Sequence, residues 1–240
     1  MKMTKIFQVF RGALPVKSCG AVIVAAGSAS RMGGIDKVMA PIGGEPMIVH
    51  TVRAFQSCDA VREIVVVTRQ DLIETIMNLC QDFDKVQAVI IGGATRQESV
   101  EIGLGTLSKS MKLVAIHDGA RPLVSGEVID RTVREASAHG AAAPAVPVKD
   151  TIKEVQNSVV TKTPDRSTLF AVQTPQVFDV DLLAGALHKA KMDEAAVTDD
   201  CSAVERLGMP VKIVDGDERN IKVTTPMDLK IAELILEEEK

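Results

Sequence analysis

The stretch GAVIVAAGSASRMGGIDK, residues 20 to 37, joins a short apolar run to a loop of small residues and glycines. The run from Ala21 to Ala26 has the length and side chains of a strand that is buried on both faces. It stops at Gly27, and the loop that follows carries two basic side chains, Arg31 and Lys37. A glycine-rich loop directly after a strand is typical of the ligand-binding edge of an α/β sheet. The stretch therefore predicts the class of fold and the place of a ligand.

Short apolar runs alternate with segments of helical period along the rest of the chain. Strands are expected at residues 21–25, 63–68, 86–91, 113–117, 141–146 and 211–214. Helices are expected at residues 47–58, 71–79, 96–107, 128–139, 180–190 and 226–238. This alternation predicts an α/β fold with a mainly parallel sheet and helices on both faces. We expect residues 1–18 to be an N-terminal extension and residues 19–240 to form a single domain.

The alternation of strand and helix patterns is interrupted at about residues 148–172. There, apolar and polar residues alternate around Gln156, Asn157 and Ser158. Alternation on both sides of a turn predicts a two-stranded β-arm that projects from the sheet. An exposed hairpin has unpaired edges that another chain can cover. We therefore expect a homodimer built on this arm.

Composition excludes several classes of protein. The 240 residues are 46% hydrophobic and 25% charged, which is ordinary for a chain with a large core. A net charge of -4, with no Trp and no Tyr, argues against a nucleic acid partner, and the acidic balance also argues against a membrane surface. No stretch has the roughly 18 to 20 apolar residues of a membrane-spanning helix. The four cysteines lack any CxxC spacing, which favours reduced thiols in a cytoplasmic protein over a disulfide framework or a zinc site.

The opening loop matches neither of the familiar phosphate-binding patterns. Ala29 stands where the dinucleotide fingerprint GxGxxG needs its second Gly, and the P-loop spacing is absent. The amides of residues 26–30, together with Arg31 and Lys37, could instead cradle a polyphosphate. The alternative is a surface loop with two incidental cations.

Two further clusters follow predicted strands. In GGATRQESV, residues 92–100, Gly93 permits close approach of a flat ligand and Ser99 can hydrogen-bond a base edge; a simple strand-to-helix turn is the alternative. In AIHDGARPLV, residues 115–124, Asp118 ends a strand and is placed to hold a divalent metal. The alternative there is a structural ion pair between Asp118 and Arg121, and we expect His117 to be structural.

The order of the clusters carries more information than any one of them. AAGSASRMGGIDK, GGATRQESV, HDGARP, VPVKDTIK, QTPQVF, TDDCSAVE and NIKVTTPMDL follow one another along the chain. This series resembles the 2-C-methyl-D-erythritol 4-phosphate cytidylyltransferase family, from about Cys19 to Glu237. The resemblance implies a Rossmann-like fold of the nucleotide-diphospho-sugar transferase type, with a β-arm that forms a homodimer. It also implies transfer of CMP from CTP to a sugar-alcohol phosphate, with release of pyrophosphate and a need for Mg²⁺.

The resemblance also implies roles for individual residues. The CTP phosphates and ribose would be surrounded by Ala25, Ala26, Gly27, Arg31 and Lys37, and cytosine would be read by Gly93 and Ser99. Asp118 would hold Mg²⁺ and organise the centre. The methylerythritol phosphate would be met by Arg121, Thr151, Arg166, Thr174 and Lys222, with Thr198 as a further contact and with Thr151 and Arg166 reaching the neighbouring subunit's site. The charge that promotes the reaction would come from Arg31, Lys37 and Lys222.

The chain departs from the family pattern at three positions. Ala29 stands where Gly is common, Asp36 stands where Pro often precedes the lysine, and Ala94 stands where an acidic residue often lies beside the base. Three other functions stay open. They are a ribitol-5-phosphate cytidylyltransferase, a dinucleotide-binding oxidoreductase, which the broken GxGxxG disfavours, and a catalytically silent nucleotide-binding dimer.

Overall fold

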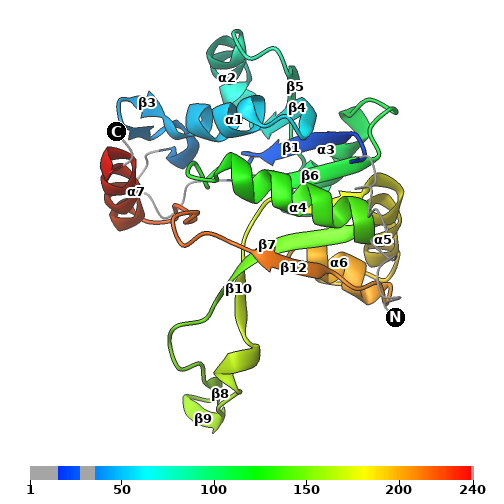
Figure 1. The fold of residues 1–240 in the computed structure, drawn as a ribbon, viewed down its shortest axis with the longest axis vertical. Coiled ribbons are helices and arrows are strands. Elements are labelled where there is room, and N and C mark those ends of the chain that lie inside the picture. Colours follow the sequence, from blue (N-terminus) through cyan, green and yellow to red (C-terminus); the bar gives the residue numbers. More distant parts are fainter. Residues whose placement is uncertain (1–15, 28–35, 239–240) are drawn as a thin grey trace, which may run out of the picture.

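The structure is a computed structural model, and it describes residues 16–27 and 36–238. A mixed, mainly parallel sheet forms its centre (Figure 1). Its eight strands are β1 (Cys19–Val24), β4 (Val61–Thr68), β5 (Val86–Ile91), β6 (Leu113–Asp118), β7 (Ala141–Pro147), β10 (Phe170–Val172), β11 (Gln176–Asp179) and β12 (Lys212–Asp215). The strand order is β10-β7-β11-β6-β1-β4-β5, and β12 pairs with β7.

The chain changes direction across the sheet beside β1. It runs from β1 outward to β4 and β5, and it then returns to place β6 on the other side of β1, parallel to it. Val24 at the end of β1 lies in register with Asp118 at the end of β6. The crevice at such a reversal, outside the carboxyl ends of the strands, is where open α/β sheets bind their ligands.

Strand β11 is one of the elements that the sequence pattern did not predict. It lies between β6 and β7 and is antiparallel to both. Strand β10 is also antiparallel to β7, whereas β12 is parallel to it. The sheet is therefore parallel at its β6-β1-β4-β5 half and mixed around β7.

Helices cover both faces of the sheet, as predicted. One face packs against α1 (Met47–Ser57), α2 (Ile73–Cys80) and α4 (Gly126–His139), and the other against α3 (Arg96–Thr106), α5 (Val180–Met192) and α6 (Asp200–Arg206). Alternate residues of β1 explain the two layers: Ala21 and Ile23 join the first core, and Val22 joins the second. No helix within the described ranges is both long and apolar enough to cross a membrane.

Several short elements and the last helix, α7 (Pro226–Glu238), complete the fold. Two-residue strands β2 (Pro41–Ile42) and β3 (Glu45–Pro46) pair with each other, and three single-turn helices lie at η1 (Lys37–Met39), η2 (Gln70–Leu72) and η3 (Arg166–Thr168). A small separate core joins α7 to β2 through Ala232 and Ile42. This core also contains Val223, which lies in the segment before α7.

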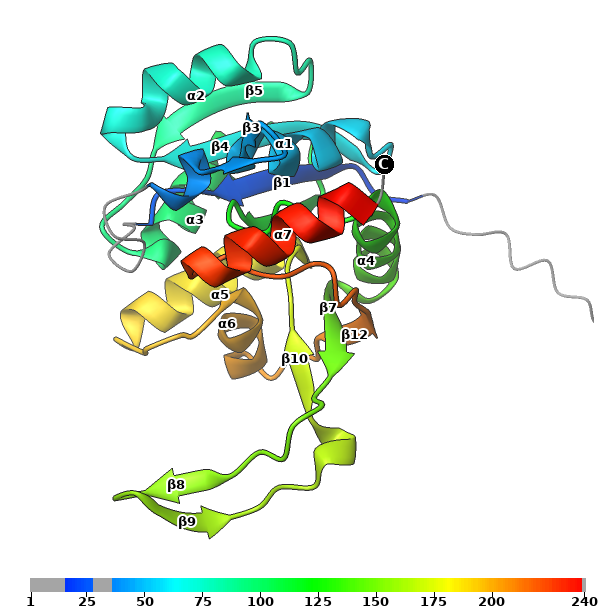
Figure 2. The same cartoon turned by 90° about the vertical axis from the view of Figure 1, so that its left-hand side faces the viewer.

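The predicted arm projects from the sheet as a separate two-stranded hairpin. Strands β8 (Glu154–Gln156) and β9 (Val159–Lys162) pair only with each other in the part of the chain that is described. Asn157 and Ser158 have φ of 50° and 63°, as a tight turn with two left-handed residues requires. Figures 1 and 2, which differ by 90°, both show the arm extending away from the rest of the chain. The predicted arm and its turn are confirmed.

Candidate active site

A pocket of about 400 Å³ opens at the carboxyl ends of β1 and β6 and at the start of α3. Segments that lie far apart in the sequence meet in its wall. Its lining residues are Val24, Ala25, Ala26, Gly27, Lys37, Val38, Gly93, Ala94, Thr95, Arg96, Ser99, Asp118, Ala120 and Lys222. The structure thus brings together most of the side chains that the sequence predicted for a nucleotide site.

Asp118 lies at the centre of the pocket's charges. Its Oδ2 lies 2.8 Å from Lys222 Nζ and 3.7 Å from Arg121 Nε, and its Oδ1 lies 3.7 Å from Arg96 Nε. The ion pair of Asp118 with Arg121, which was the alternative to a metal site, is therefore present, but it is the longer of the two contacts at Oδ2. Three cations from three segments surround one carboxylate.

These cations control the protonation of Asp118. Burial by itself would raise the pKa of the carboxyl group, but the charges of Lys222 and Arg96 outweigh burial and lower the pKa to about 2. Asp118 is therefore an anion at neutral pH. It is also the only carboxylate among the described residues that line the pocket.

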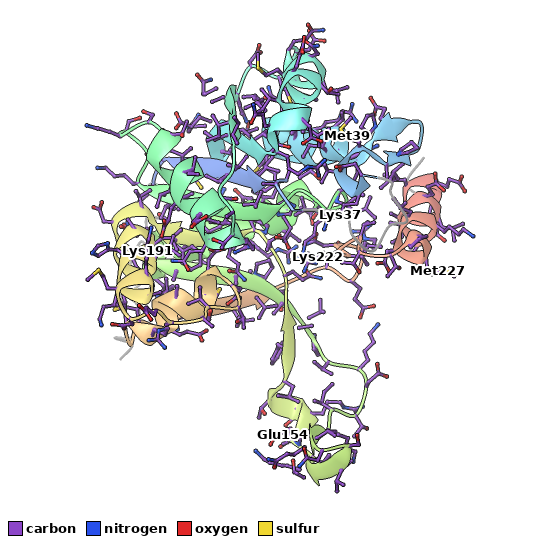
Figure 3. The ribbon with its side chains drawn as sticks, turned by 180° about the vertical axis from the view of Figure 1, so that it is seen from behind. Lys37, Met39, Glu154, Lys191, Lys222 and Met227 are labelled. Atoms are coloured by element: carbon purple, nitrogen blue, oxygen red, sulfur yellow. The ribbon has the colours of Figure 1, made fainter. Side chains whose placement is uncertain are left out.

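Lys37 and Lys222 reach the pocket from different parts of the chain. Lys37 is the first residue of η1, whose N-cap is Asp36, and Lys222 lies in the segment between β12 and α7. In Figure 3 their labels lie close together, whereas Lys191 of α5 lies well away from them. Two positive charges in one partly enclosed pocket favour an anionic ligand such as a polyphosphate.

The turn from β5 into α3 forms another part of the wall. Ser99 is 1% exposed; its hydroxyl donates to the carbonyl oxygen of Thr95 at 3.0 Å and accepts from the Gly93 amide at 3.2 Å. A Cβ on Gly93 would lie 2.3 Å from the Cβ of Glu98, so only glycine fits this turn. Ser99 thus shapes the turn that presents Gly93, and its predicted contact with cytosine stays a prediction.

Arg96 and Asp200 belong to the site although sequence reasoning did not single them out. Arg96 lines the pocket at the start of α3 and forms a 2.8 Å ion pair with Asp200 of α6, which is 2% exposed. Burial raises the pKa of Asp200, and Arg96 opposes that shift. The sequence did offer a signal for Arg96, which is an arginine in the first turn of a predicted helix after a glycine pair. It offered no signal for the partner, Asp200, about a hundred residues away.

Thr174 and Arg121 are absent from the pocket lining, although both contact Asp118. Burial lowers the pKa of His117 to about 4, so the ring is neutral, and its Nε2 donates to the Arg121 carbonyl oxygen at 3.1 Å. His117 Nδ1 then accepts from the Thr174 hydroxyl at 3.0 Å, and that hydroxyl accepts from the Asp118 amide at 3.1 Å. In this structure Thr174 and His117 hold the backbone of Asp118, as expected for a structural histidine.

The other predicted site residues lie outside the pocket or outside the described ranges. Thr151 is exposed on the arm, Arg166 lies in η3 at the base of the arm, and Thr198 is exposed before α6. Arg166 donates to the Lys149 carbonyl oxygen at 2.7 Å. Arg31 and Ala29 fall outside the described residues. The pocket of one chain therefore contains the predicted nucleotide side more completely than the predicted acceptor side.

The described side chains offer few ligands for a metal ion. Within residues 16–27 and 36–238, no group of three or more His, Cys, Asp or Glu side chains is arranged to hold an ion. Among the described residues that line the pocket, only Asp118 has a carboxylate. Its Oδ2 has the short contact with Lys222, whereas its Oδ1 has only the 3.7 Å contact with Arg96. One carboxylate suits Mg²⁺, which keeps waters and shares phosphate oxygens with its substrate.

Comparison with known proteins gives one consistent result. Residues 19–238 match the family described as 2-C-methyl-D-erythritol 4-phosphate cytidylyltransferase. A protein of that name from Symbiobacterium thermophilum is 46% identical over 220 residues, which cover 91% of this chain and 92% of the relative. Another from Caldanaerobacter subterraneus subsp. tengcongensis is 44% identical, covering 90% of this chain and 97% of the relative.

Solved structures resemble the fold as well. A crystal structure of the 4-diphosphocytidyl-2C-methyl-D-erythritol synthase from Anaerococcus prevotii superposes with a TM-score of 0.83 at 33% identity. The match covers 92% of this chain and 96% of that structure. The likeness therefore extends over most of the chain rather than over a single motif.

Proposed function

The chain belongs to the 2-C-methyl-D-erythritol 4-phosphate cytidylyltransferase family, and we propose that the pocket around Asp118 is where it carries out the reaction of that family. The enzyme transfers the cytidylyl group of CTP to 2-C-methyl-D-erythritol 4-phosphate, a step of isoprenoid precursor biosynthesis, and releases pyrophosphate. The observation that carries the assignment of the site is the 2.8 Å pair of Asp118 with Lys222, with Lys37 in the wall of the same pocket.

The chemistry requires positive charge more than it requires a base. A phosphate oxygen of the acceptor forms a bond to the α-phosphorus of CTP, and the bond from that phosphorus to the oxygen leading to the β-phosphorus breaks. Both reactants are anions, and a phosphate nucleophile is already deprotonated near neutral pH, so no general base is needed. Lys37 and Lys222 would place positive charge beside the phosphates and stabilise the negative charge that develops on their oxygens in the transition state. Arg31 is proposed for the same role.

The walls of the pocket suit the nucleotide. Ala25, Ala26 and Gly27 follow β1 with small side chains, so backbone amides can approach phosphates and ribose closely. Gly93 and Ser99 would lie beside the base. Arg121, Thr151, Arg166, Thr174 and Thr198 are proposed for the acceptor side, directly or by holding the residues that touch it.

Mg²⁺ is proposed as the metal of the reaction, with Asp118 as the protein group that holds it. The support is that Asp118 is ionised and that no other described residue of the pocket lining has a carboxylate. When bound, the ion would neutralise part of the phosphate charge. We expect chelation with EDTA to stop pyrophosphate release and added Mg²⁺ to restore it; full activity after chelation would contradict the role.

A homodimer is proposed on the basis of the arm. Val155, Val159 and Val160 are 58%, 65% and 54% exposed, although they are the apolar side chains of a hairpin. A two-stranded hairpin alone is marginally stable in water. A second chain packed on the arm would bury these valines and would also stabilise the hairpin. The partner would then bring Thr151 and Arg166 toward the first chain's acceptor side. A monodisperse monomer in light scattering at micromolar concentration would contradict the dimer.

A cytoplasmic location is part of the same proposal. The support is that all four cysteines are buried free thiols, as in proteins kept in a reducing compartment.

One experiment tests the function. The protein is incubated with Mg²⁺, each nucleoside triphosphate in turn, and either 2-C-methyl-D-erythritol 4-phosphate or ribitol 5-phosphate, and pyrophosphate release is measured. We expect release with CTP and the methylerythritol substrate only. Release with ribitol 5-phosphate instead would overturn the acceptor assignment, and absence of release with every pair would favour a silent nucleotide-binding protein.

A further inference from the structure

The segment between β12 and α7 carries Lys222 into the pocket, yet none of its residues 216–225 belongs to a helix or strand. Two contacts hold it from the β6 side of the site. Arg121 Nη1 donates to the Asn220 carbonyl oxygen at 2.7 Å, and the Val223 amide donates to the Ala120 carbonyl oxygen at 2.8 Å. These contacts lie on either side of Lys222 in the sequence. The position of Lys222 therefore also depends on the other contacts that fix this segment.

Gln173 fixes the beginning of the segment. Its Nε2 donates to the Asp217 carbonyl oxygen at 2.7 Å, and its Oε1 accepts from the Asp217 amide at 3.2 Å. The side chain thus satisfies both backbone groups of one residue, as a neighbouring strand would. Gln173 is 6% exposed, so water cannot readily replace these bonds.

Gln173 makes this contact from the opposite side of β7. Val172 of β10 and Asp215 of β12 both pair with Ala145 of β7, and a strand residue has one neighbour on each side. The Gln173 side chain therefore passes over Ala145 to reach the segment after β12. Gly216 leaves the room for it, because a Cβ there would lie 2.6 Å from Gln173 Oε1.

Asn220 fixes the segment a second time, close to the lysine. Its Nδ2 donates to the Thr174 carbonyl oxygen at 2.9 Å and to Gln173 Oε1 at 3.3 Å, and Asn220 is 0% exposed. Both acceptors belong to the residues that directly follow β10, the strand by which the chain returns from the arm to the sheet. The two buried amides therefore join the base of the arm to the segment that presents Lys222.

We propose that Gln173 and Asn220 are positioning residues, whose side-chain amides hold the segment so that Lys222 reaches Asp118. This inference rests on the role proposed for Lys222. Neither residue lines the pocket, so neither is placed to touch a ligand there directly. An exposed contact, between Lys149 of the arm base and Glu218, joins the same two parts of the chain. Both of its side chains are mostly exposed, and such pairs contribute little.

The test is a double-mutant cycle on turnover, followed with radiolabelled CTP so that slow variants are measurable. Asn220→Ala is made in the wild-type protein and in Lys222→Ala. If Asn220 acts through Lys222, we expect it to lower kcat about tenfold or more in the wild-type protein and less than about twofold when Lys222 is already gone, because coupled residues are not additive. A residue that merely supports the fold would lower kcat by the same factor in both backgrounds.

Control variants distinguish a failure of this inference from a failure of the proposed function. Glu218→Gln, in the same segment but exposed, should leave kcat unchanged. Gln173→Met is carried through the same cycle and decides the matter if Asn220→Ala does not fold, as judged by circular dichroism. Equal losses in both backgrounds would overturn the positioning role and leave the cytidylyltransferase function intact. Normal turnover of Lys222→Ala alone would instead overturn the role of Lys222, and the inference with it.

Discussion

The carboxylate of Asp36 and the guanidinium of Arg69 form an ion pair, with 2.5 Å between Oδ2 and Nη2. Arg69 Nη1 also donates to the Gly27 carbonyl oxygen at 3.5 Å. Gly27 lines the pocket, and Asp36 is the N-cap of the turn that begins with Lys37. One arginine therefore joins the Gly27 part of the pocket wall to the turn that begins with Lys37. The tether depends on the carboxylate at position 36, one of the three positions where the sequence departs from the pattern that it resembles.

Replacing Arg69 tests whether this tether matters for CTP. In Arg69→Ala the Gly27 and Asp36 segments lose a shared partner, and a partly buried pair contributes on the order of 1 kcal/mol, so we expect kcat/KM for CTP to fall about fivefold. Steady-state kinetics with the methylerythritol substrate saturating measures it. Asp71→Asn is the matched control, because Asp71 also pairs with Arg69, at 2.9 Å, but is exposed and lies outside the pocket lining. Equal effects of both variants would contradict the tether.

Removing either pocket lysine tests the electrostatic mechanism. We expect Lys37→Ala and Lys222→Ala to fold normally and to lose on the order of 10² to 10³ in kcat, the usual effect of one lost transition-state contact. Lys191→Ala supplies the control, since Lys191 is exposed on α5 and far from the pocket (Figure 3). Near-normal turnover of either pocket variant would show that its lysine does not carry the proposed charge.

The cysteines should be unreactive in the folded protein. Burial raises the pKa of the Cys80 thiol to about 11 and also raises the pKa of the other three thiols. A raised pKa favours the protonated thiol, so the reactive thiolate is scarce at about pH 8. We expect 5,5′-dithiobis(2-nitrobenzoic acid) to label none of the four native thiols within minutes and all of them in denaturant. Rapid labelling of the native protein would contradict the buried arrangement.

The sequence predicted the elements that have a clear period or composition. The apolar run beginning at Ala21 is β1, the alternating stretch around Asn157 is the arm, and Pro226 begins α7. Strand β11 was missed because its four residues are too short for a period to show, and it is defined by pairing with β6 and β7 on either side. Such pairing depends on the folded sheet rather than on local sequence.

The site residues divide in the same way: those with a local sequence signal were predicted, and those that depend on a distant partner were not. Asp118 and Lys37 were found because each follows a strand or a glycine-rich loop at a recognisable place. Arg96 and Arg69 were not, because an arginine becomes part of the site through its partner. Those partners, Asp200 and Asp36, lie far along the chain and meet them only after folding.

Two glycines of α3 give a matched test of packing against the sheet. A Cβ on Gly103 would lie 2.4 Å from Val22 Cγ1 and 3.0 Å from Val67 Cγ2, both in buried strands, whereas a Cβ on Gly105 would meet nothing within 4 Å. We expect Gly103→Ala to destabilise the protein by about 1 to 3 kcal/mol, the usual cost of overpacking a core. Gly105→Ala should stabilise it by roughly 0.5 to 1 kcal/mol, because alanine loses less backbone entropy in a helix. Urea unfolding of both variants measures the difference, and equal effects would mean that α3 does not pack on β1 and β4 as closely as the structure has it.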